Sequence, residues 1–303
     1  MFSFLGVIED SVGRGGGAEL AAPVMRELGI VPALQARDVG DLDAPIRGDE
    51  RDLHTGIVAS ADVLHMTRVV RSAVLRQIRS GARPYVMGGC CAAAVGALAG
   101  ARDALGRLSL VYVDGHQDLY DGRTSDTGEA ADMPFGTALG LGPGEWVDAA
   151  GGASVDPSSA WLVGFSDQEK TLAAGARQAS EILPPSRVHS ASSVREHGSG
   201  QLGSAIRDEV EKQAANSFWL HVDVDVLDGS IFPATDYPAE DGLTWDELTE
   251  LLLPLSTASH LTGVSIGCYN PERARTGVRT GVRADVGDSR GCPAARRVTL
   301  RSI

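Results

Sequence analysis

The hydrophobic positions of this chain fall into short continuous runs that alternate with longer periodic segments. The runs are rich in β-branched residues and predict strands at 2–8, 84–89, 108–116, 160–165, 218–227 and 261–269. The periodic segments predict helices at 18–29, 58–80, 92–105, 168–182, 202–215 and 244–256. Within 58–80 the apolar residues recur at intervals of four and predict one buried helical face: Met66, Val70, Val74 and Ile78.

Apolar strands that alternate with helices are typical of a parallel sheet covered on both faces. We therefore predict an α/β fold, a three-layer α/β/α sandwich with a mainly parallel central sheet. No repeat or linker divides the chain, so residues 1–270 are predicted to form a single domain. Residues 271–303 hold eight arginines against three acidic residues and show no helical apolar stripe. They are predicted to form an irregular basic tail, either loosely packed or a functional arm.

Composition narrows the classes of partner. The formal charge of −13 argues against nucleic acid or an anionic membrane surface as the main partner, because proteins bind both through positively charged surface patches. A neutral or cationic small molecule fits better. No apolar run approaches the ~20 residues of a membrane span, and the N-terminus reads as a strand rather than a secretory signal, so a cytoplasmic location is expected.

Four cysteines do not make a secreted disulfide framework. Cys90 and Cys91 are adjacent, and consecutive Cα atoms lie ~3.8 Å apart, whereas disulfides usually need ~4.4–6.8 Å. We expect both to be free thiols.

Acidic residues interrupt two of the predicted strands near their carboxyl ends. Asp114, His116 and Asp118 follow one another at intervals of two in "VDGHQD", and Asp223 and Asp225 do the same in "HVDVDVLD". If the strands stay extended, their two-residue period points each set to one side. Neighbouring strands would then bring five potential metal ligands together at the edge where open parallel sheets place their sites.

A single aspartate at a strand end is commonly a turn or helix-capping residue. Two acidic pairs within apolar strands are different, because buried carboxylates repel one another unless a cation compensates them. Oxygen-rich ligation with an imidazole suits Mn²⁺, and shared carboxylates suit two ions ~3.5–4 Å apart. The pattern therefore favours a metal site.

Three blocks of the chain resemble the ureohydrolases, the family of arginase, agmatinase and formimidoylglutamase. These blocks are "GGCC" at 88–91, "VDGHQD" at 113–118, and "HVDVDVLD" at 221–228 with the trailing "PATDYPAEDGLT" at 233–244. The resemblance runs from "GGGAEL" at 15–20 to about Pro271. It implies an arginase-like fold, two Mn²⁺ per chain, a homo-oligomer of three or six subunits, and hydrolysis of a C–N bond in a guanidino or modified guanidino compound. The products would be an amine and urea or a substituted urea.

The resemblance also implies roles for individual residues. Asp114 and Asp223 would bridge the two ions around a hydroxide. One ion would also bind Cys91 and Asp118, and the other His116 and Asp225. Asp118, Asp225 and His116 would take part in catalysis, with one of the two aspartates orienting water or relaying its proton.

Cysteine is unusual at the first ligand position. Cys91 stands where the family usually has histidine, although some members, among them an N-hydroxyarginine hydrolase, carry cysteine there. A thiolate is a softer ligand than imidazole, so Zn²⁺ or Fe²⁺ could replace Mn²⁺ at this position. Cys90 replaces an aspartate that supports the ligand, and the sequence offers no reason for the thiol.

The residues that the resemblance assigns to substrate binding are Tyr120, Thr127, Glu129, Asp167, Glu169 and Cys268. Cys268 replaces a glutamate that faces the guanidinium group in arginase and agmatinase, and Ala131 replaces a histidine that shuttles protons in arginase. Tyr120 stands in place of an asparagine that reads the α-carboxylate of arginine. A cation without its carboxylate partner loses ~1.5–3 kcal/mol, so free L-arginine is a doubtful substrate.

Other interpretations remain open. The chain could be a catalytically silent metal-binding homologue, or it could hydrolyse a formimino or amide substrate at the same site. Asp167 and Glu169 could equally belong to a solvated loop. His221 could line the metal-site face of its strand, although a hydrogen-bonded structural role is the favoured prediction. The remaining histidines are expected to be structural: His54, His65, His189, His197 and His260.

Overall fold

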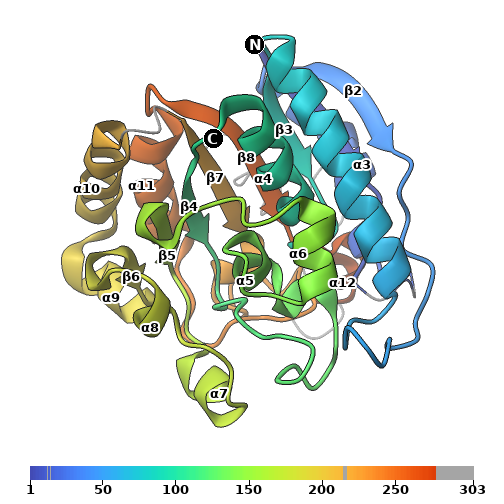
Figure 1. Ribbon diagram of the computed structural model, residues 1–303. Coiled ribbons are helices and arrows are strands. Elements are labelled where there is room, and N and C mark those ends of the chain that lie inside the picture. Colours follow the sequence, from blue (N-terminus) through green and yellow to red (C-terminus); the bar gives the residue numbers. More distant parts are fainter. Residues whose placement is uncertain (12, 14, 214–216, 278–303) are drawn as a thin grey trace.

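The computed structural model describes residues 1–11, 13, 15–213 and 217–277. Its centre is an eight-stranded sheet with the order β2-β1-β3-β8-β7-β4-β5-β6, in which every neighbouring pair is parallel (Figure 1). The strands are β1 (Phe2–Val7), β2 (Arg37–Leu42), β3 (Arg83–Met87), β4 (Ser109–Val113), β5 (Ala160–Val163), β6 (Val188–His189), β7 (Phe218–Asp223) and β8 (Leu261–Gly267). All six predicted strands are present, and the two that the sequence did not predict, β2 and β6, lie at the edges.

Helices cover both faces of the sheet, which confirms the predicted three-layer sandwich. One face packs against α3 (Ser60–Arg79), α4 (Ala92–Leu105), α5 (Pro134–Ala138) and α6 (Gly144–Ala150). The other packs against α1 (Ala21–Glu27), α2 (Ile30–Ala33), α9 (Ala191–His197), α10 (Ser199–Lys212) and α11 (Trp245–Ser256). The short helices α7 (Gln168–Ala173) and α8 (Ala179–Ile182) follow β5.

The two cores follow from the strand period. Leu110 and Tyr112 of β4 point into one core, whereas Val111 and Val113 point into the other. In α3 the predicted apolar face is confirmed, because Met66, Val70 and Val74 are buried and Ile78 packs partly buried against the same core.

Helices α3 and α4 approach each other through glycines. A Cβ at Gly96 would meet the carbonyl oxygen of Thr67 at 2.7 Å, and one at Gly100 would meet that of Arg71 at 2.4 Å. Larger residues at these two positions would push the helices apart. The small residues of α4 therefore let it pack closely against α3.

Two helix predictions need correction. The helix predicted over 168–182 is divided into α7 and α8, because the chain turns at Gly175 in the left-handed region with a φ of 71°. The segment from 271 was predicted to be irregular, yet α12 occupies Pro271–Gly277. Asn270 Oδ1 accepts hydrogen bonds from the backbone N–H groups of Glu272 at 3.0 Å and Arg273 at 3.2 Å, so Asn270 caps this helix. The rest of the predicted tail, 278–303, lies outside the described residues.

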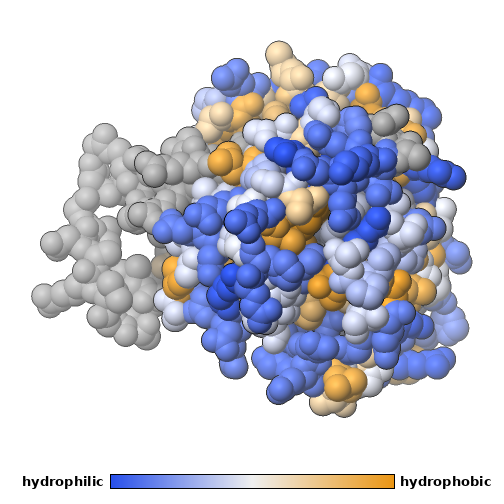
Figure 2. All heavy atoms as spheres, turned by 90° about the vertical axis from the view of Figure 1, so that its left-hand side faces the viewer, coloured by the Kyte–Doolittle hydropathy of each residue, from blue (hydrophilic) through white to orange (hydrophobic). Residues whose placement is uncertain are grey.

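The face formed by α9, α10 and α11 is mostly hydrophilic, with separate small groups of apolar side chains (Figure 2). Leu172 on α7 and Leu253 on α11 are exposed large apolar residues. Among the described helices, none is long and apolar enough to cross a membrane.

Candidate metal centre

Four adjacent strands at the centre of the sheet end at one site. In the order of the sheet these are β3, β8, β7 and β4, and the residues that they deliver at or just beyond their carboxyl ends are Cys91, Cys268, Asp223 and Asp114. Strands β4 and β7 are direct neighbours, with Val113 in register with Val222. The predicted meeting of the two acidic blocks is therefore present, at the edge where parallel sheets place their sites.

The way in which the ligands converge differs from the prediction. The strand period does not carry through either block, because β4 ends at Val113 and β7 ends at Asp223. Asp225 lies instead in a 3₁₀ turn, η5 (Val224–Val226), and Asp118 has a left-handed φ of 52°.

In each block an aspartate side chain accepts a hydrogen bond from the backbone N–H two residues onward, and this bond starts a turn. Asp114 Oδ1 accepts the N–H of His116 at 2.7 Å, and Asp223 Oδ1 accepts the N–H of Asp225 at 2.7 Å. Aspartates commonly bond the backbone two residues onward in this way. The same carboxylates that could bind metal thus also shape the loops that carry the next ligand.

One group of oxygen and nitrogen donors is compact. The ligand atoms of Asp114, His116 and Asp225 all lie within 4.8 Å of one another. His116 Nδ1 lies 3.1 Å from Asp225 Oδ2 and 3.7 Å from Asp114 Oδ1. Both aspartates are almost fully buried, whereas the His116 side chain keeps 26% of its surface exposed. A divalent cation would find two carboxylates and an imidazole here, with one open side.

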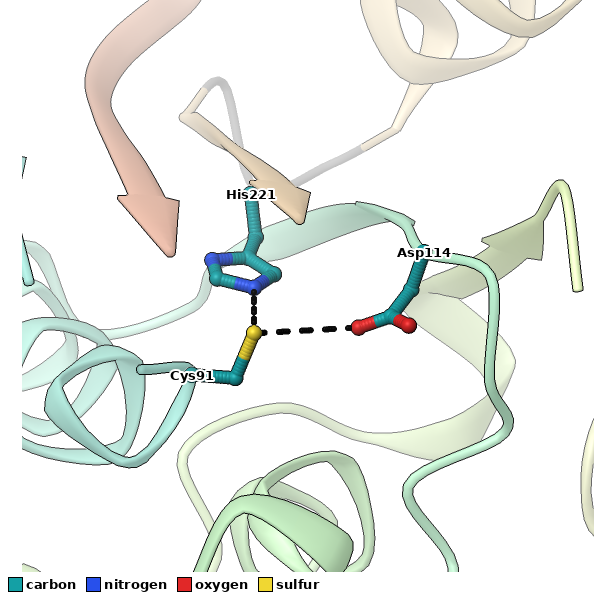
Figure 3. Close-up of side chains that lie close together, drawn as sticks. All are labelled: Cys91, Asp114 and His221. Atoms are coloured by element: carbon teal, nitrogen blue, oxygen red, sulfur yellow. Dashed lines mark hydrogen bonds between the residues drawn. The ribbon is translucent and has the colours of Figure 1, made fainter. Parts of the chain in front are cut away.

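A second set of donors surrounds Cys91, the residue that precedes α4. Its sulfur lies 3.1 Å from His221 Nε2 and 3.8 Å from Asp114 Oδ2 (Figure 3). It also lies 3.7 Å from Cys268 Sγ and contacts Asp223 Oδ2. Cys91 therefore belongs to two compact groups of possible ligands, one with Asp114 and His221 and one with Asp223 and Cys268.

Asp118 stands apart from these three groups. Its Oδ2 accepts a hydrogen bond of 2.6 Å from the buried hydroxyl of Tyr112, which lies two residues before Asp114 on β4. Its ligand role implied by the resemblance stays a prediction. Tyr112 was not singled out from the sequence, although its strand position places it on the same face as Asp114.

Burial dominates the electrostatics of the carboxylates. Burial first, and then the neighbouring negative charges, raise the pKa of Asp114 and Asp118 well above the usual range. The same causes raise the pKa of Asp225 to about 7. For His116, burial opposes the charged form, but the carboxylates of Asp225 and Asp114 outweigh it and raise its pKa. Without a cation, this cluster holds protons that a bound metal would displace.

The sulfur side of the site is uncharged. Burial raises the pKa of Cys91, and Cys268 and Asp223 raise it further. Burial lowers the pKa of His221 to about 3, so its imidazole is neutral. His221 was predicted to be structural, and it does bond Ser265 Oγ through Nδ1 at 2.8 Å. Its other nitrogen nevertheless faces Cys91, which the sequence could not show.

A cavity of about 270 Å³, here called the acidic cavity, opens above the carboxylates. The aspartates that line it are Asp118, Asp126, Asp132, Asp167, Asp223 and Asp225. Lys170 is the only lysine or arginine among the described lining residues. Burial raises the pKa of Asp132 and of Asp167. The cavity is therefore suited to a cation.

Most of the residues predicted to bind substrate lie around this space. Tyr120, Thr127, Asp167 and Cys268 line the acidic cavity. Glu129 lines an adjoining cavity of about 350 Å³, which shares Ala131, Tyr237 and Cys268 with the first. The Tyr237 hydroxyl donates a hydrogen bond to Glu129 between the two cavities, an interaction that the sequence did not suggest.

Glu169 lines neither of these two cavities. It lies exposed at the start of α7 and lines a separate surface depression with Ser166 and Arg195. Ala131 is 9% exposed and borders both cavities. The position that carries the shuttle histidine in the resembling family is thus next to the site here, but without a side chain that can carry a proton.

Glu9 was also missed from the sequence, and it explains the environment of Cys90. It follows β1 and is 1% exposed. Its Oε1 accepts the backbone N–H of Cys90 at 2.8 Å, and its Oε2 accepts the Cys90 thiol at 3.1 Å. The carboxylate that supports this loop therefore comes from a neighbouring strand. The available signal was the same as for the aspartates, an acidic residue just after an apolar strand.

Replacement of Glu9 by glutamine is expected to flatten the pH dependence of the free energy of unfolding. Burial raises the pKa of Glu9 from 4.5 to about 7. Its contribution to stability is therefore complete below about pH 4.5 and is lost as the pH rises through about 7, a change of about 3 kcal/mol. Urea unfolding of metal-free protein between pH 5 and 8 measures the difference. Glu27→Gln, at an exposed position of α1, is the control, and an equal fall for Glu9→Gln and wild type would contradict the prediction.

Comparisons with known proteins agree with this fold. The family model described as "Arginase family" matches residues 7–286. The chain is 27% identical over 293 residues to an arginase of Bacillus caldovelox, which covers 90% of this chain and 93% of that protein. It is 30% identical over 166 residues to an N(omega)-hydroxy-L-arginine amidinohydrolase of Streptomyces lavendulae, covering 53% of this chain and 51% of that protein.

The fold itself is shared with solved structures. The native structure of the Bacillus caldovelox arginase at pH 5.6 superposes with a TM-score of 0.80, covering 99% of this chain and 96% of that one at 23% identity. At this level of identity the match concerns the arrangement of strands and helices. It confirms the arginase-like fold expected from the sequence.

Proposed function

Because the chain belongs to the arginase family, we propose that it is a metal-dependent hydrolase of C–N bonds in a guanidino or modified guanidino compound. The observation that carries the proposal is the compact group of Asp114, His116 and Asp225, of which His116 and Asp225 line the acidic cavity. The family match and the relatives named for arginine and hydroxyarginine chemistry support the choice of substrate class.

The donor set fits divalent cations. Asp114, Asp223 and Asp225 are each at most 2% exposed, and burial of several carboxylates so close together is costly without a compensating charge. Their oxygens, with the imidazole of His116, suit Mn²⁺. We propose two ions per chain, with Asp114 and Asp223 placed between the two sets of ligands and Cys91 on the side opposite His116.

The proposed reaction joins the oxygen of water to the central guanidino carbon and breaks one C–N bond. Bound divalent ions would supply hydroxide near neutral pH by lowering the pKa of water. Asp225 or Asp118, which both line the cavity, accepts the proton of water and returns it to the departing nitrogen. An amine and urea or a substituted urea are released.

The lining of the cavity bears on which guanidino compound is used. A guanidinium group meets several aspartates, whereas a substrate carboxylate would find Lys170 as the one lysine or arginine among the described lining residues. Tyr120 offers a hydroxyl and an aromatic face at the same wall. We therefore propose that substrates with a neutral or cationic far end are preferred to free L-arginine. A homo-oligomer and a cytoplasmic location remain predictions.

Metal analysis combined with a panel of guanidino compounds tests the proposed function. Protein loaded with Mn²⁺ is expected to bind close to two ions per chain and to release urea or a substituted urea from at least one compound. Removal of the metal with a chelator should abolish release, and readdition should restore it. Metal-replete protein that is inert across the panel would count decisively against the proposal.

A specific observation favours a second candidate, a metal-binding homologue without activity. Ala131 and Cys268 line the cavity where the resembling enzymes have a histidine and a glutamate. A silent homologue would bind metal with no release of any product, and Cys91→His would not change that. A formimino or amide hydrolase would instead release a formamide or an acid, which product analysis separates from urea.

A further inference from the structure

The donors around Cys91 differ in kind from those around His116. Cys91 Sγ lies next to a second sulfur, Cys268 Sγ, and next to an imidazole nitrogen, His221 Nε2. Cys91 and His221 are each 1% exposed, whereas Cys268 is half-buried and reaches the acidic cavity. Cys91 therefore has a sulfur and a nitrogen donor beside it, in addition to the carboxylate oxygens of Asp223 and Asp114.

We propose that two thiolates form a separate metal position that prefers Zn²⁺, held by the compact group of Cys91, Cys268 and Asp223, with the imidazole of His221 approaching from the Cys91 side. It would lie beside the carboxylate position of the proposed enzyme, so that the loaded protein holds two different metals. The inference rests on the proposed function in that both positions belong to the same centre. It adds two ligands, Cys268 and His221, and the identity of the ion.

The distance between the sulfurs fits zinc. Two thiolates at about 2.3 Å from a tetrahedral Zn²⁺ lie about 3.8 Å apart. Cys91 Sγ and Cys268 Sγ lie 3.7 Å apart. Asp223, whose carboxylate contacts Cys91 and belongs to the same compact group, is available as a further ligand. A thiolate between the carboxylates of Asp114 and Asp223 would be strongly repelled unless a cation lay among them.

His221 is oriented as a metal ligand would be. Its Nδ1 lies 2.8 Å from Ser265 Oγ, and the same oxygen accepts the indole N–H of Trp219 at 2.9 Å. A hydroxyl oxygen has two lone pairs, so Ser265 can accept from both groups. When it accepts from both, His221 carries its proton on Nδ1 and directs the lone pair of Nε2 toward the sulfur of Cys91 (Figure 3). Metal-binding histidines are usually held by such a bond through the other nitrogen.

The position of Asp118 also supports a zinc position at Cys91. The resemblance assigns this residue to the ion at Cys91, but its carboxylate accepts the Tyr112 hydroxyl and is not part of the compact groups around Cys91. His221 belongs to one of those groups and Cys268 to the other. Soft thiolates and imidazole select Zn²⁺ over Mn²⁺, whereas carboxylates and a single imidazole suit Mn²⁺.

Cobalt reports directly on thiolate ligands, because sulfur bound to Co²⁺ gives a charge-transfer absorption band in the near ultraviolet. We suggest titrating the reduced, metal-free full chain with Co²⁺ in a Cys292→Ser background, which removes the cysteine outside the described residues. The band is expected to saturate at one equivalent. Zn²⁺ should abolish it at one equivalent, and Mn²⁺ should leave it in place.

Variants assign the ligands. Cys91→Ala and Cys268→Ala are each expected to lower the band by about half, because each removes one of two thiolates. Cys90→Ala is the matched control and should keep the full band, since its sulfur faces Glu9. His221→Ala should keep the band but weaken Co²⁺ binding at least about tenfold. Should Cys91→Ala fail to fold, Cys91→His still tests the inference, because it keeps a ligand and removes one sulfur.

The outcomes separate this inference from the proposed function. Co²⁺ that binds without a sulfur band, or a band that depends on Cys90, overturns the thiolate site and leaves the hydrolase proposal standing. Equilibrium dialysis that finds no bound metal overturns both. Full hydrolysis by metal-free protein, lost when Cys91 is alkylated, overturns both in favour of a cysteine nucleophile assisted by His221.

Discussion

Asp114→Asn is expected to reduce kcat/KM by at least about 10³-fold and to lower the number of bound ions, because a metal centre contributes several kcal/mol to catalysis. Asp114 is the residue that links the two sets of ligands. One of its oxygens approaches His116 and the other approaches Cys91. Asparagine keeps the shape of the side chain but loses the charge and one anionic oxygen.

The fold should survive this substitution. Asparagine still offers a carbonyl oxygen to the N–H of His116, which Asp114 Oδ1 accepts at 2.7 Å. Metal content by elemental analysis and product release under the same conditions measure the two effects together. Asp148→Asn, at an exposed position of α6, is the control for the exchange itself. Retention of both ions and of activity within tenfold of wild type would exclude Asp114 as a metal ligand in the reaction.

The sequence predicted where the site lies better than how it is built. Continuous apolar strands with acidic residues at their ends were enough to predict that the blocks of Asp114 and Asp223 meet if their strands are neighbours, and β4 and β7 are neighbours in the sheet. The expectation that the two-residue strand period would point all the ligands to one side was wrong for Asp118 and Asp225, which lie beyond the strands. The reason is that an aspartate just beyond a strand bonds the following backbone and starts a turn, which competes with extension.

Contacts between distant segments could not be read from the sequence. The direction of His221 depends on Ser265 of β8, and the environment of Cys90 depends on Glu9 after β1. Neither pair has a local pattern, because the partners meet only when β1, β3, β8 and β7 lie side by side. Cys268 was singled out only as the replacement of a family glutamate. Its approach to Cys91 required the sheet order.

Helix ends show the same limit on a smaller scale. The capping of α12 by Asn270, followed by Pro271 at the first helical position, is a recognised start signal at the boundary of a segment that was judged by its charge and its lack of a helical apolar stripe. Local signals of this kind are available from sequence when each candidate boundary is inspected. The overall composition of residues 271–303 gave no indication of this helix start.

Removal of the metals is expected to destabilise the protein strongly at pH 8 and only weakly at pH 5. Burial raises the pKa of Asp114 and Asp118, and that of Asp225 to about 7. For groups whose pKa is raised on folding, the stability they contribute in metal-free protein is present at low pH and is lost as the pH rises through the raised values. Divalent cations replace the same protons, so metal binding strengthens over this range.

The expected difference in the free energy of unfolding between loaded and metal-free protein follows from the binding equilibrium. With free metal at about 1,000 times its dissociation constant at pH 8, the loaded protein should be about 4 kcal/mol more stable than the metal-free protein. At pH 5, below the pKa of about 7 of Asp225, that carboxyl holds its proton and the difference should be small. Urea unfolding with metal or with chelator, at one-unit steps from pH 5 to 8, measures it. Asp225→Asn should reduce the stabilisation and its pH dependence together. Equal stabilisation at pH 5 and pH 8 would mean that the ions bind away from the buried carboxylates.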